Sequence, residues 1–289
     1  MRVVVIGAGF VGTPLCALLR DRGHEAFAVT RTGEGGGLAC DVGDPRSVAA
    51  LSASVGGCDA IVHCASSGRG AGDRSARYRS VYLRGCENLL AEFSPRRMVF
   101  ASSSSVYGQE DGSWVDEQAE TSPAAATGAI LLEAEDVVTA AGGAVARLAG
   151  IYGPGRSVLL RRFLEGAAQI DGDTEDSLGR WINQIHREDA ASALTHLTDP
   201  GVEPGIYNVA DDRPLTQREC YAEFVRRFGG ELPPVRSPDR GRSRGWSDKR
   251  VSNTKLRATG WVPRYPSYFE ALDTDGEIAP SIVAQLRAE

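Results

Sequence analysis

Three glycines near the start of the chain have the spacing of a phosphate-binding turn. The four β-branched residues at positions 3–6 run directly into Gly7, Gly9 and Gly12, and an apolar stretch with helical spacing follows. In such a turn the first glycine permits the tight bend, the second lets backbone amides approach a pyrophosphate, and the third lets the helix pack closely on the strand. The amides and dipole at the helix N-terminus then favour an anion. The pattern predicts a dinucleotide site rather than a glycine turn without a ligand, with contacts from Gly7, Gly9, Phe10, Val11 and Gly12.

The residues after the second predicted strand, 25–30, bear on the choice of dinucleotide. Where NAD enzymes place an acid against the ribose 2′-hydroxyl, this chain has Thr30 followed by Arg31. A guanidinium suits a 2′-phosphate, because it is always charged and offers several donors. The alternative is a solvated loop arginine. We therefore expect Thr30 and Arg31 to contact NADP, and NAD remains an option.

The elements that must position these residues alternate regularly up to residue 148. Short apolar strands are expected at 25–30, 38–40, 59–65, 97–101 and 144–148, with helices between them, and the strand at 97–101 opens into four consecutive serines, 102–105. This alternation predicts an α/β fold with a doubly wound parallel sheet of the Rossmann type. We expect a dinucleotide-binding domain over 1–150 and a smaller, mainly substrate-binding lid over 151–289. The chain is expected to return to the first domain at 182–210, and an exposed basic loop is expected at 233–244.

Composition limits the classes of partner. The 289 residues carry a formal net charge of −6, so bulk electrostatics does not favour nucleic acid or an anionic membrane. The six cysteines form no CxxC pair and the four histidines lack metal-ligand spacing, so we expect reduced thiols and no metal. Met1 leads directly into the first strand, and no apolar run reaches membrane-spanning length. We expect a soluble, cytoplasmic protein that binds a small-molecule substrate, with a homodimer as an open possibility.

Eight stretches together resemble the extended short-chain dehydrogenase/reductase superfamily, which contains nucleotide-sugar epimerases and dehydratases. They cover nearly the whole chain and occur in the order and spacing of that superfamily. They are GAGFVG at 7–12, HCAS at 63–66, YLRGCENLL at 82–90, SSSSVYG at 102–108, RLAGIYGPG at 147–155, NQIHREDAA at 183–191, GIYNVAD at 205–211 and NTKLRATGWVP at 253–263. The resemblance implies a Rossmann domain that binds NAD(P) across the carboxyl ends of its strands, and a C-terminal substrate lid.

The resemblance also implies roles for particular residues. Asp41 would bond the adenine, although a helix cap or a simple turn acid is the alternative for it. A serine after the fifth strand would polarise the substrate carbonyl, and the alignment places it at Ser103. His186 resembles a structural residue of the superfamily rather than a catalytic one. The remaining implied contacts are Ala65 and Ser66 along the cofactor, and Ser104, Arg156 and Asn183 toward the substrate.

The catalytic Tyr-x-x-x-Lys pair of the superfamily is absent. The alignment puts Thr127 at the tyrosine position and Leu131 at the lysine position. A threonine hydroxyl is far less acidic than a phenol, whose pKa is about 10. The chain therefore resembles an atypical branch without this pair. Ser103, Thr127 and Tyr82 are the candidate proton-transfer residues, and a core-packing role for Tyr82 is equally open.

Three functions are compatible with these residues. The first is an NAD(P)-dependent oxidoreductase acting on a small or sugar-like carbonyl or hydroxyl substrate, with non-standard proton-transfer residues. The second is an isomerase or lyase of the epimerase/dehydratase type with tightly held NAD(P). The third is a non-catalytic NADP-sensing regulator. The fold alone does not decide among them. The serine run favours a chemical role of either kind, whereas the missing lysine favours sensing.

Overall fold

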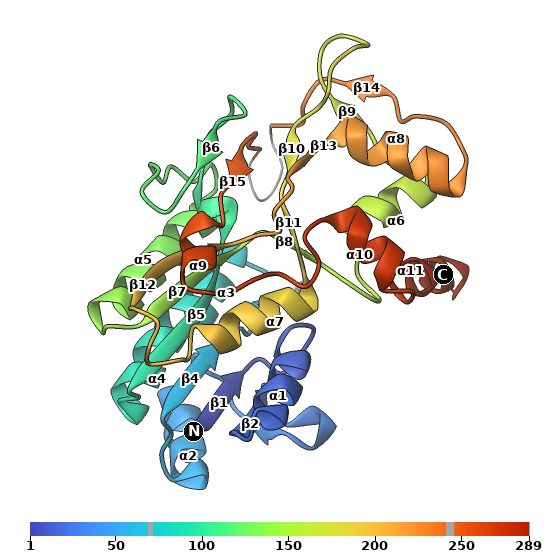
Figure 1. Ribbon diagram of the computed structural model, residues 1–289. Coiled ribbons are helices and arrows are strands. Elements are labelled where there is room, and N and C mark those ends of the chain that lie inside the picture. Colours follow the sequence, from blue (N-terminus) through green and yellow to red (C-terminus); the bar gives the residue numbers. More distant parts are fainter. Residues whose placement is uncertain (69–71, 241–245, 289) are drawn as a thin grey trace.

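A seven-stranded parallel sheet forms the centre of the protein in the computed structural model, which describes residues 1–68, 72–240 and 246–288 (Figure 1). Its strand order is β12-β7-β5-β4-β1-β2-β3. Val3, Val4 and Val5 of the central strand are completely buried, as expected for a strand covered on both faces. The strands are β1 (Arg2–Ile6), β2 (Glu25–Thr30), β3 (Leu38–Ala39), β4 (Ala60–His63), β5 (Arg97–Ser103), β7 (Ala144–Leu148) and β12 (Gly205–Val209). The predicted fold class is therefore confirmed.

Helices cover both faces of the sheet. α1 (Gly12–Asp21) packs against α7 (Arg187–His196) on one face (Figure 1). After β3 the chain crosses to β4, on the other side of β1, and the helices that follow lie on the opposite face (Figure 1). There α2 packs on α4, and α4 packs on α5. The elements of this second face are α2 (Pro45–Val55), α3 (Arg74–Tyr78), a π-helical stretch (Arg79–Arg84), α4 (Gly85–Phe93) and α5 (Ala126–Ala140).

A second lobe has its own apolar cluster, which includes Leu160, Phe224, Tyr268 and Ile282. It contains the C-terminal helices and lies apart from the central sheet in Figure 1. Its elements are α6 (Val158–Leu164), β9 (Ile170–Asp171), α8 (Gln217–Phe228), β14 (Val235–Arg236), α10 (Tyr268–Thr274) and α11 (Ile278–Ala288). Residues 241–244 of the expected basic loop lie outside the described residues.

Short strand pairs connect the two lobes. β11 pairs in parallel with β8, β10 pairs antiparallel with β13, and β15 pairs in parallel with β6. These pairs bring segments that are distant in sequence to the carboxyl edge of the central sheet. The elements are β6 (Trp114–Val115), β8 (Gly150–Tyr152), β10 (Trp181–Ile182), β11 (Gln184–His186), β13 (Leu215–Thr216), β15 (Arg250–Val251) and α9 (Thr254–Ala258), with 3-10 turns at Glu34–Gly36 and Ser104–Val106.

Buried polar groups hold the start of α7 to the C-terminal segment. His186 is completely buried, and its Nε2 lies 3.2 Å from Asp275 Oδ2. Burial is the main cause that lowers the pKa of His186 to about 4, so the ring is neutral at pH 7. The Asp189 carboxylate accepts from the amides of Arg264 and Tyr265 at 2.7 and 2.9 Å. These contacts give His186 a structural role.

Neither a membrane span nor a metal centre is found in the part of the chain that the structure describes. No helix there is long and apolar enough to cross a bilayer. No group of three or more His, Cys, Asp or Glu side chains there is arranged to hold a metal ion.

Candidate active site

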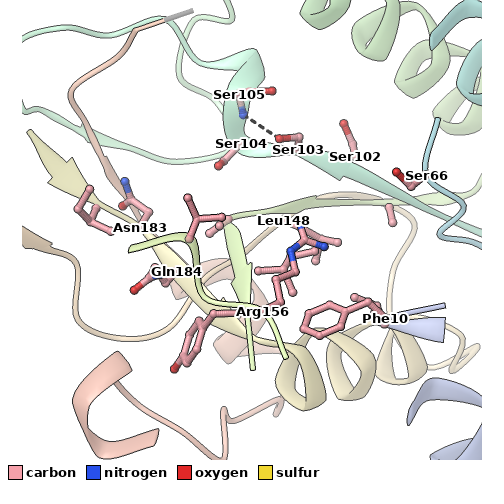
Figure 2. A pocket seen from close by; sticks show the side chains of 18 of the residues that line it. Phe10, Ser66, Ser102, Ser103, Ser104, Ser105, Leu148, Arg156, Asn183 and Gln184 are labelled. Carbon is pink, nitrogen blue, oxygen red and sulfur yellow. Dashed lines mark hydrogen bonds between the residues drawn. The ribbon is translucent and has the colours of Figure 1, made fainter. Parts of the chain in front are cut away.

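A cleft of about 1110 Å³ lies at the carboxyl ends of β1, β2, β4 and β5 and extends to the second lobe. Figure 2 shows part of its wall, with Phe10 on one side and Ser103 and Asn183 on the other. Most of the residues predicted for the site line this cleft. They are Gly7, Gly9, Phe10, Val11, Thr30, Arg31, Ala65, Ser66, Tyr82, Ser103, Ser104, Arg156 and Asn183.

The glycine turn has the geometry that a bound pyrophosphate needs. Gly7 has φ +95°, and a Cβ there would lie 2.3 Å from the Cα of Ala65. A Cβ on Gly12 would lie 2.2 Å from the carbonyl oxygen of Gly7, so this glycine serves the close packing of α1 and does not line the cleft. A Cβ on Gly9 would meet nothing within 4 Å. The open space at Gly9 and the absence of a side-chain cap on α1 leave room and N–H donors for a phosphate.

The end of β2 offers polar groups to the adenosine half of a dinucleotide. Thr30 and Arg31 both line the cleft, and Arg31 is exposed. Thr30 Oγ1 is buried and has no hydrogen-bond partner among the described residues. A buried hydroxyl without a partner is costly, and a ribose hydroxyl or phosphate oxygen would satisfy it. These residues therefore fit the cofactor that the glycine turn predicts.

Asp41 is exposed, and it is not one of the residues that line the cleft. Its Oδ1 accepts from the amide of Gly43 at 3.0 Å, and its own amide donates to Ser47 Oγ at 2.9 Å. These bonds form a local turn before α2, whose cap is Asp44. The position matches the turn-acid alternative.

Tyr82 lies on the π-helical stretch, a feature that often occurs at functional sites. Its ring packs edge-on against Tyr78, with 4.9 Å between the ring centroids. Its hydroxyl oxygen accepts from the amide of Ser67 at 3.3 Å and therefore keeps its proton for donation. Tyr82 thus both packs in an aromatic cluster and lines the cleft.

Two neighbouring residues of the serine run, Ser102 and Ser103, make different contacts. Ser103 Oγ accepts from the amide of Ser105 at 3.2 Å (Figure 2), so the hydroxyl proton of Ser103 is available to a ligand. Ser102 Oγ instead donates to the buried carboxylate of Glu135. The Ser103 hydroxyl can therefore bond a ligand in the cleft, whereas the Ser102 hydroxyl links the end of β5 to α5.

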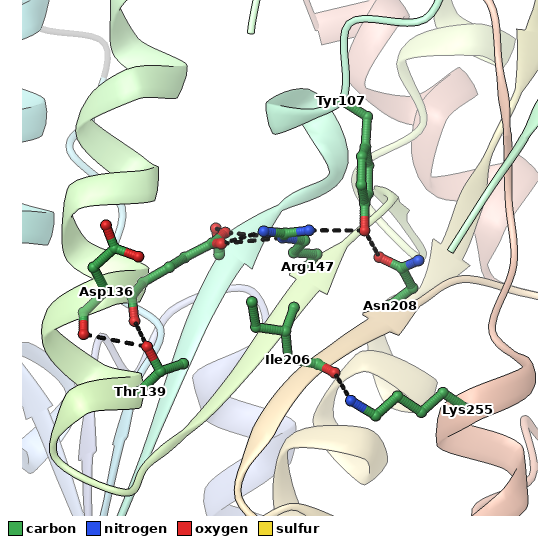
Figure 3. A network of polar contacts seen from close by, with 9 residues as sticks. Tyr107, Asp136, Thr139, Arg147, Ile206, Asn208 and Lys255 are labelled. Carbon is green, nitrogen blue, oxygen red and sulfur yellow. Dashed lines mark hydrogen bonds and ion pairs between the residues drawn. The ribbon is translucent and has the colours of Figure 1, made fainter. Parts of the chain in front are cut away.

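A buried polar network fixes the floor of this region (Figure 3). Arg147 Nη2 lies 2.6 Å from Glu135 Oε2, and both side chains are almost fully buried. Arg147 Nη1 donates to the Tyr107 hydroxyl at 2.9 Å, and that hydroxyl donates to Asn208 Oδ1 at 2.9 Å. The network joins α5, β7, β12 and the turn after Ser103. Tyr107 is 1% exposed, so its hydroxyl belongs to this buried network.

Helix α5 presents an apolar side chain where the superfamily has its lysine. Leu131 is 4% exposed and lines the cleft. Thr127, one turn earlier in the helix, is 8% exposed, and its shorter side chain does not belong to the cleft wall. Residues four apart share one face of a helix, yet of the two only Leu131 lines the cleft. The helix therefore supplies neither a phenol nor an ammonium group there.

Arg156 and Asn183 line the cleft from the side of the second lobe. The guanidinium carbon of Arg156 lies 5.2 Å from the centre of the Phe10 ring, so the arginine covers one side of the glycine turn (Figure 2). Asn183 Nδ2 donates to the carbonyl oxygen of Lys249 at 2.8 Å, and Asn183 Oδ1 accepts from the amide of Val251 at 2.7 Å. The Asn183 side chain thus holds the Lys249 segment against the cleft.

Lys249 is a cleft residue that the sequence analysis missed. It is 5% exposed and lines the cleft, and its Nζ donates to the carbonyl oxygen of Tyr107 at 2.9 Å. It precedes β15 and is far in sequence from the serine run. A signal was present: the chain contains two lysines, Lys249 and Lys255, among its 32 basic residues.

The chain belongs to the NAD dependent epimerase/dehydratase family, whose sequence model matches residues 3–210. This membership makes it an NAD(P)-dependent enzyme and confirms the resemblance to the short-chain dehydrogenase/reductase superfamily.

Three similar proteins illustrate the relationship. Protein YeeZ of Escherichia coli is 28% identical over 290 aligned positions, covering 92% of this chain and 96% of that protein. The 2-alkyl-3-oxoalkanoate reductase of Stenotrophomonas maltophilia is 28% identical over 263 positions, covering 79% and 76%. The UDP-glucose 4-epimerase of Thermus thermophilus, solved with NAD, superposes with a TM-score of 0.76 at 22% identity over 98% of this chain and 99% of that one. This last likeness concerns the fold.

Proposed function

We propose that the protein is an NADP-dependent oxidoreductase that reduces the carbonyl group of a small or sugar-like substrate, or oxidises the corresponding alcohol. The observation that carries the proposal is that one cleft contains the glycine turn, Arg31 and the Ser103 hydroxyl with its proton unengaged. The similar protein from Stenotrophomonas maltophilia is named as a reductase, which supports net reduction.

The preference for NADP rests on Arg31. Its guanidinium is always charged and can pair with a 2′-phosphate, whereas a carboxylate at this position would favour the 2′-hydroxyl of NAD. The glycine turn and the uncapped start of α1 would hold the diphosphate. When bound, the nicotinamide supplies or accepts a hydride.

The substrate side of the cleft contains Ser103, Ser104 and Arg156. The Ser103 hydroxyl can donate a hydrogen bond to a carbonyl oxygen, because its own oxygen is the acceptor in its bond with Ser105. Such a donor stabilises the negative charge that develops on the oxygen as the carbonyl is reduced. Arg156 adds positive charge for an anionic group of the substrate.

A panel of carbonyl compounds tests this function. We expect NADPH to be consumed in a one-to-one ratio with a reduced product identified by mass spectrometry. Conversion of a sugar substrate without net loss of NADPH would identify an isomerase or lyase and contradict the proposal. Tight NADPH binding with no turnover of any substrate would instead identify a cofactor sensor.

A further inference from the structure

The distribution of basic residues singles out Lys249. The chain uses arginine at 30 of its 32 basic positions and lysine at 249 and 255. Lys255 is exposed and donates to the carbonyl oxygen of Ile206, away from the cleft. Lys249 is buried in the cleft wall. An arginine stays protonated in proteins, whereas a buried lysine can release and regain its proton. Of the two lysines, the one in the cleft wall therefore lies where a transferable proton would be useful.

The ammonium group of Lys249 is anchored to the turn that carries Ser103. Its Nζ donates to the Tyr107 carbonyl oxygen at 2.9 Å and to Ser247 Oγ at 2.7 Å. The amide of Tyr107 in turn donates to the carbonyl oxygen of Ser104 at 3.3 Å. An ammonium has three N–H donors, and two have acceptors among the described residues. One N–H bond of Lys249 is thus left for a ligand of the cleft.

The backbone around Lys249 is held in place from the second lobe. The Asn183 side chain bonds the carbonyl oxygen of Lys249 and the amide of Val251. Asp248 Oδ1 accepts from the amide of Trp181 at 2.8 Å. Strand β15 then pairs with β6. These bonds fix the backbone on both sides of Lys249, and the two bonds made by its Nζ hold the ammonium in the cleft wall.

The surroundings of Lys249 favour a proton that is exchangeable near neutral pH. Burial is the main cause that lowers its pKa to about 8, and the positive charge of Arg180 acts in the same direction. The carboxylate of Asp248 acts in the opposite direction. Acid–base catalysis is most effective when the pKa of the group lies near the operating pH.

We propose that Lys249 is the proton donor and acceptor of this active site and replaces the tyrosine and lysine that α5 lacks. The assignment rests on the proposed function. During reduction a hydride adds to the carbonyl carbon, and the C=O π electron pair moves to the oxygen. One N–H bond of the Lys249 ammonium breaks and its proton bonds to that oxygen, which leaves a neutral amine and an alcohol. A hydronium ion of the solvent then gives its proton to the amine and becomes water, and oxidation follows the reverse path.

The first test measures the proton of Lys249 directly and needs no substrate. Protein containing ¹³Cε-labelled lysine gives two lysine signals, which Lys249→Met and Lys255→Met assign. We expect the Lys249 signal of the wild-type protein to titrate with a midpoint near 8. A midpoint at the ordinary lysine value of about 10.4 would overturn the assignment.

The second test is kinetic and uses the substrate found with the carbonyl panel. Lys249→Met should lower the single-turnover rate by about 10²–10⁴ and leave NADPH affinity unchanged. Lys249→Arg should not restore the rate, because the guanidinium does not release its proton. Lys255→Met is the matched control and should react at the wild-type rate. The wild-type reduction rate should also fall above about pH 8.

The outcomes separate the two proposals. A wild-type protein that reduces no carbonyl compound overturns the proposed function. A Lys249→Met protein that reduces the substrate as fast as wild type, or a Lys249→Arg protein that does so, overturns the role of Lys249 alone. The carbon titration detects a Lys249→Met protein that merely misfolds, because the Lys255 signal would then move as well.

Discussion

Arg147 and Glu135 form a buried ion pair 2.6 Å long directly behind the serine run. Glu135 lies on α5 and Arg147 on β7, and the same carboxylate accepts from Ser102 at the end of β5. Three elements are therefore locked together beneath the site. The pair fixes the turn that carries Ser103, although neither charge lines the cleft.

We expect Arg147→Met to lower the free energy of unfolding by about 3–5 kcal/mol, because it leaves the Glu135 carboxylate buried without its partner. Urea unfolding measures the change. Arg79→Met is the matched control, since Arg79 pairs with Glu133 on the exposed side of the same helix and should change stability little. Equal effects of the two substitutions would contradict the role of the buried pair.

Substitutions of Gly9 and Gly12 should affect different properties, cofactor binding for Gly9 and stability for Gly12. A Cβ at Gly9 meets no atom within 4 Å beyond its chain neighbours, so Gly9→Val should fold with little change in melting temperature and lose NADPH binding. Gly12→Ala should lower stability by at least about 1–3 kcal/mol, because its Cβ would overlap the Gly7 carbonyl oxygen. Circular dichroism and calorimetry separate the two effects. Native NADPH affinity in Gly9→Val would refute the assignment of the turn.

Arg31 should discriminate between the two dinucleotides. Arg31→Ala should weaken NADPH binding roughly tenfold to hundredfold, the usual effect of losing a charge-assisted bond, and leave NADH binding unchanged. Calorimetry with both cofactors measures this. An equal loss of affinity for NADPH and NADH, or tighter NADH binding by the wild-type protein, would show that Arg31 does not recognise the 2′-phosphate.

Ser103 should affect the reaction and not the cofactor. Ser103→Ala removes a hydrogen-bond donor from the developing oxyanion, an effect of about 2.7–4 kcal/mol, or 10²–10³ in kcat. NADPH affinity should hardly change. Ser105→Ala is a suitable control, because it is the backbone amide of Ser105, kept in this variant, that bonds Ser103. An unchanged rate in Ser103→Ala would remove this residue from the mechanism.

The parts of the fold that could be predicted are those that local sequence determines. Strand β2 has the predicted bounds, and the glycine turn follows β1 as expected, because a continuous apolar strand and a Gly-x-Gly-x-x-Gly turn carry their own geometry. Lys249 could not be found in this way, because pairing between β15 and β6 brings it to the serine turn from the far end of the chain. Likewise, helical spacing put Thr127 and Leu131 on one face but could not show that only the longer side chain would line the cleft.

The most direct test of the central claim is the transfer of deuterium from NADPH that carries deuterium at both C4 positions of the nicotinamide. With a carbonyl substrate from the panel, the account predicts one deuterium on the former carbonyl carbon of the product and one NADP⁺ formed for each product molecule. A product without deuterium, or product formed with no net NADP⁺, would contradict the assignment of this protein as an NADP-dependent oxidoreductase.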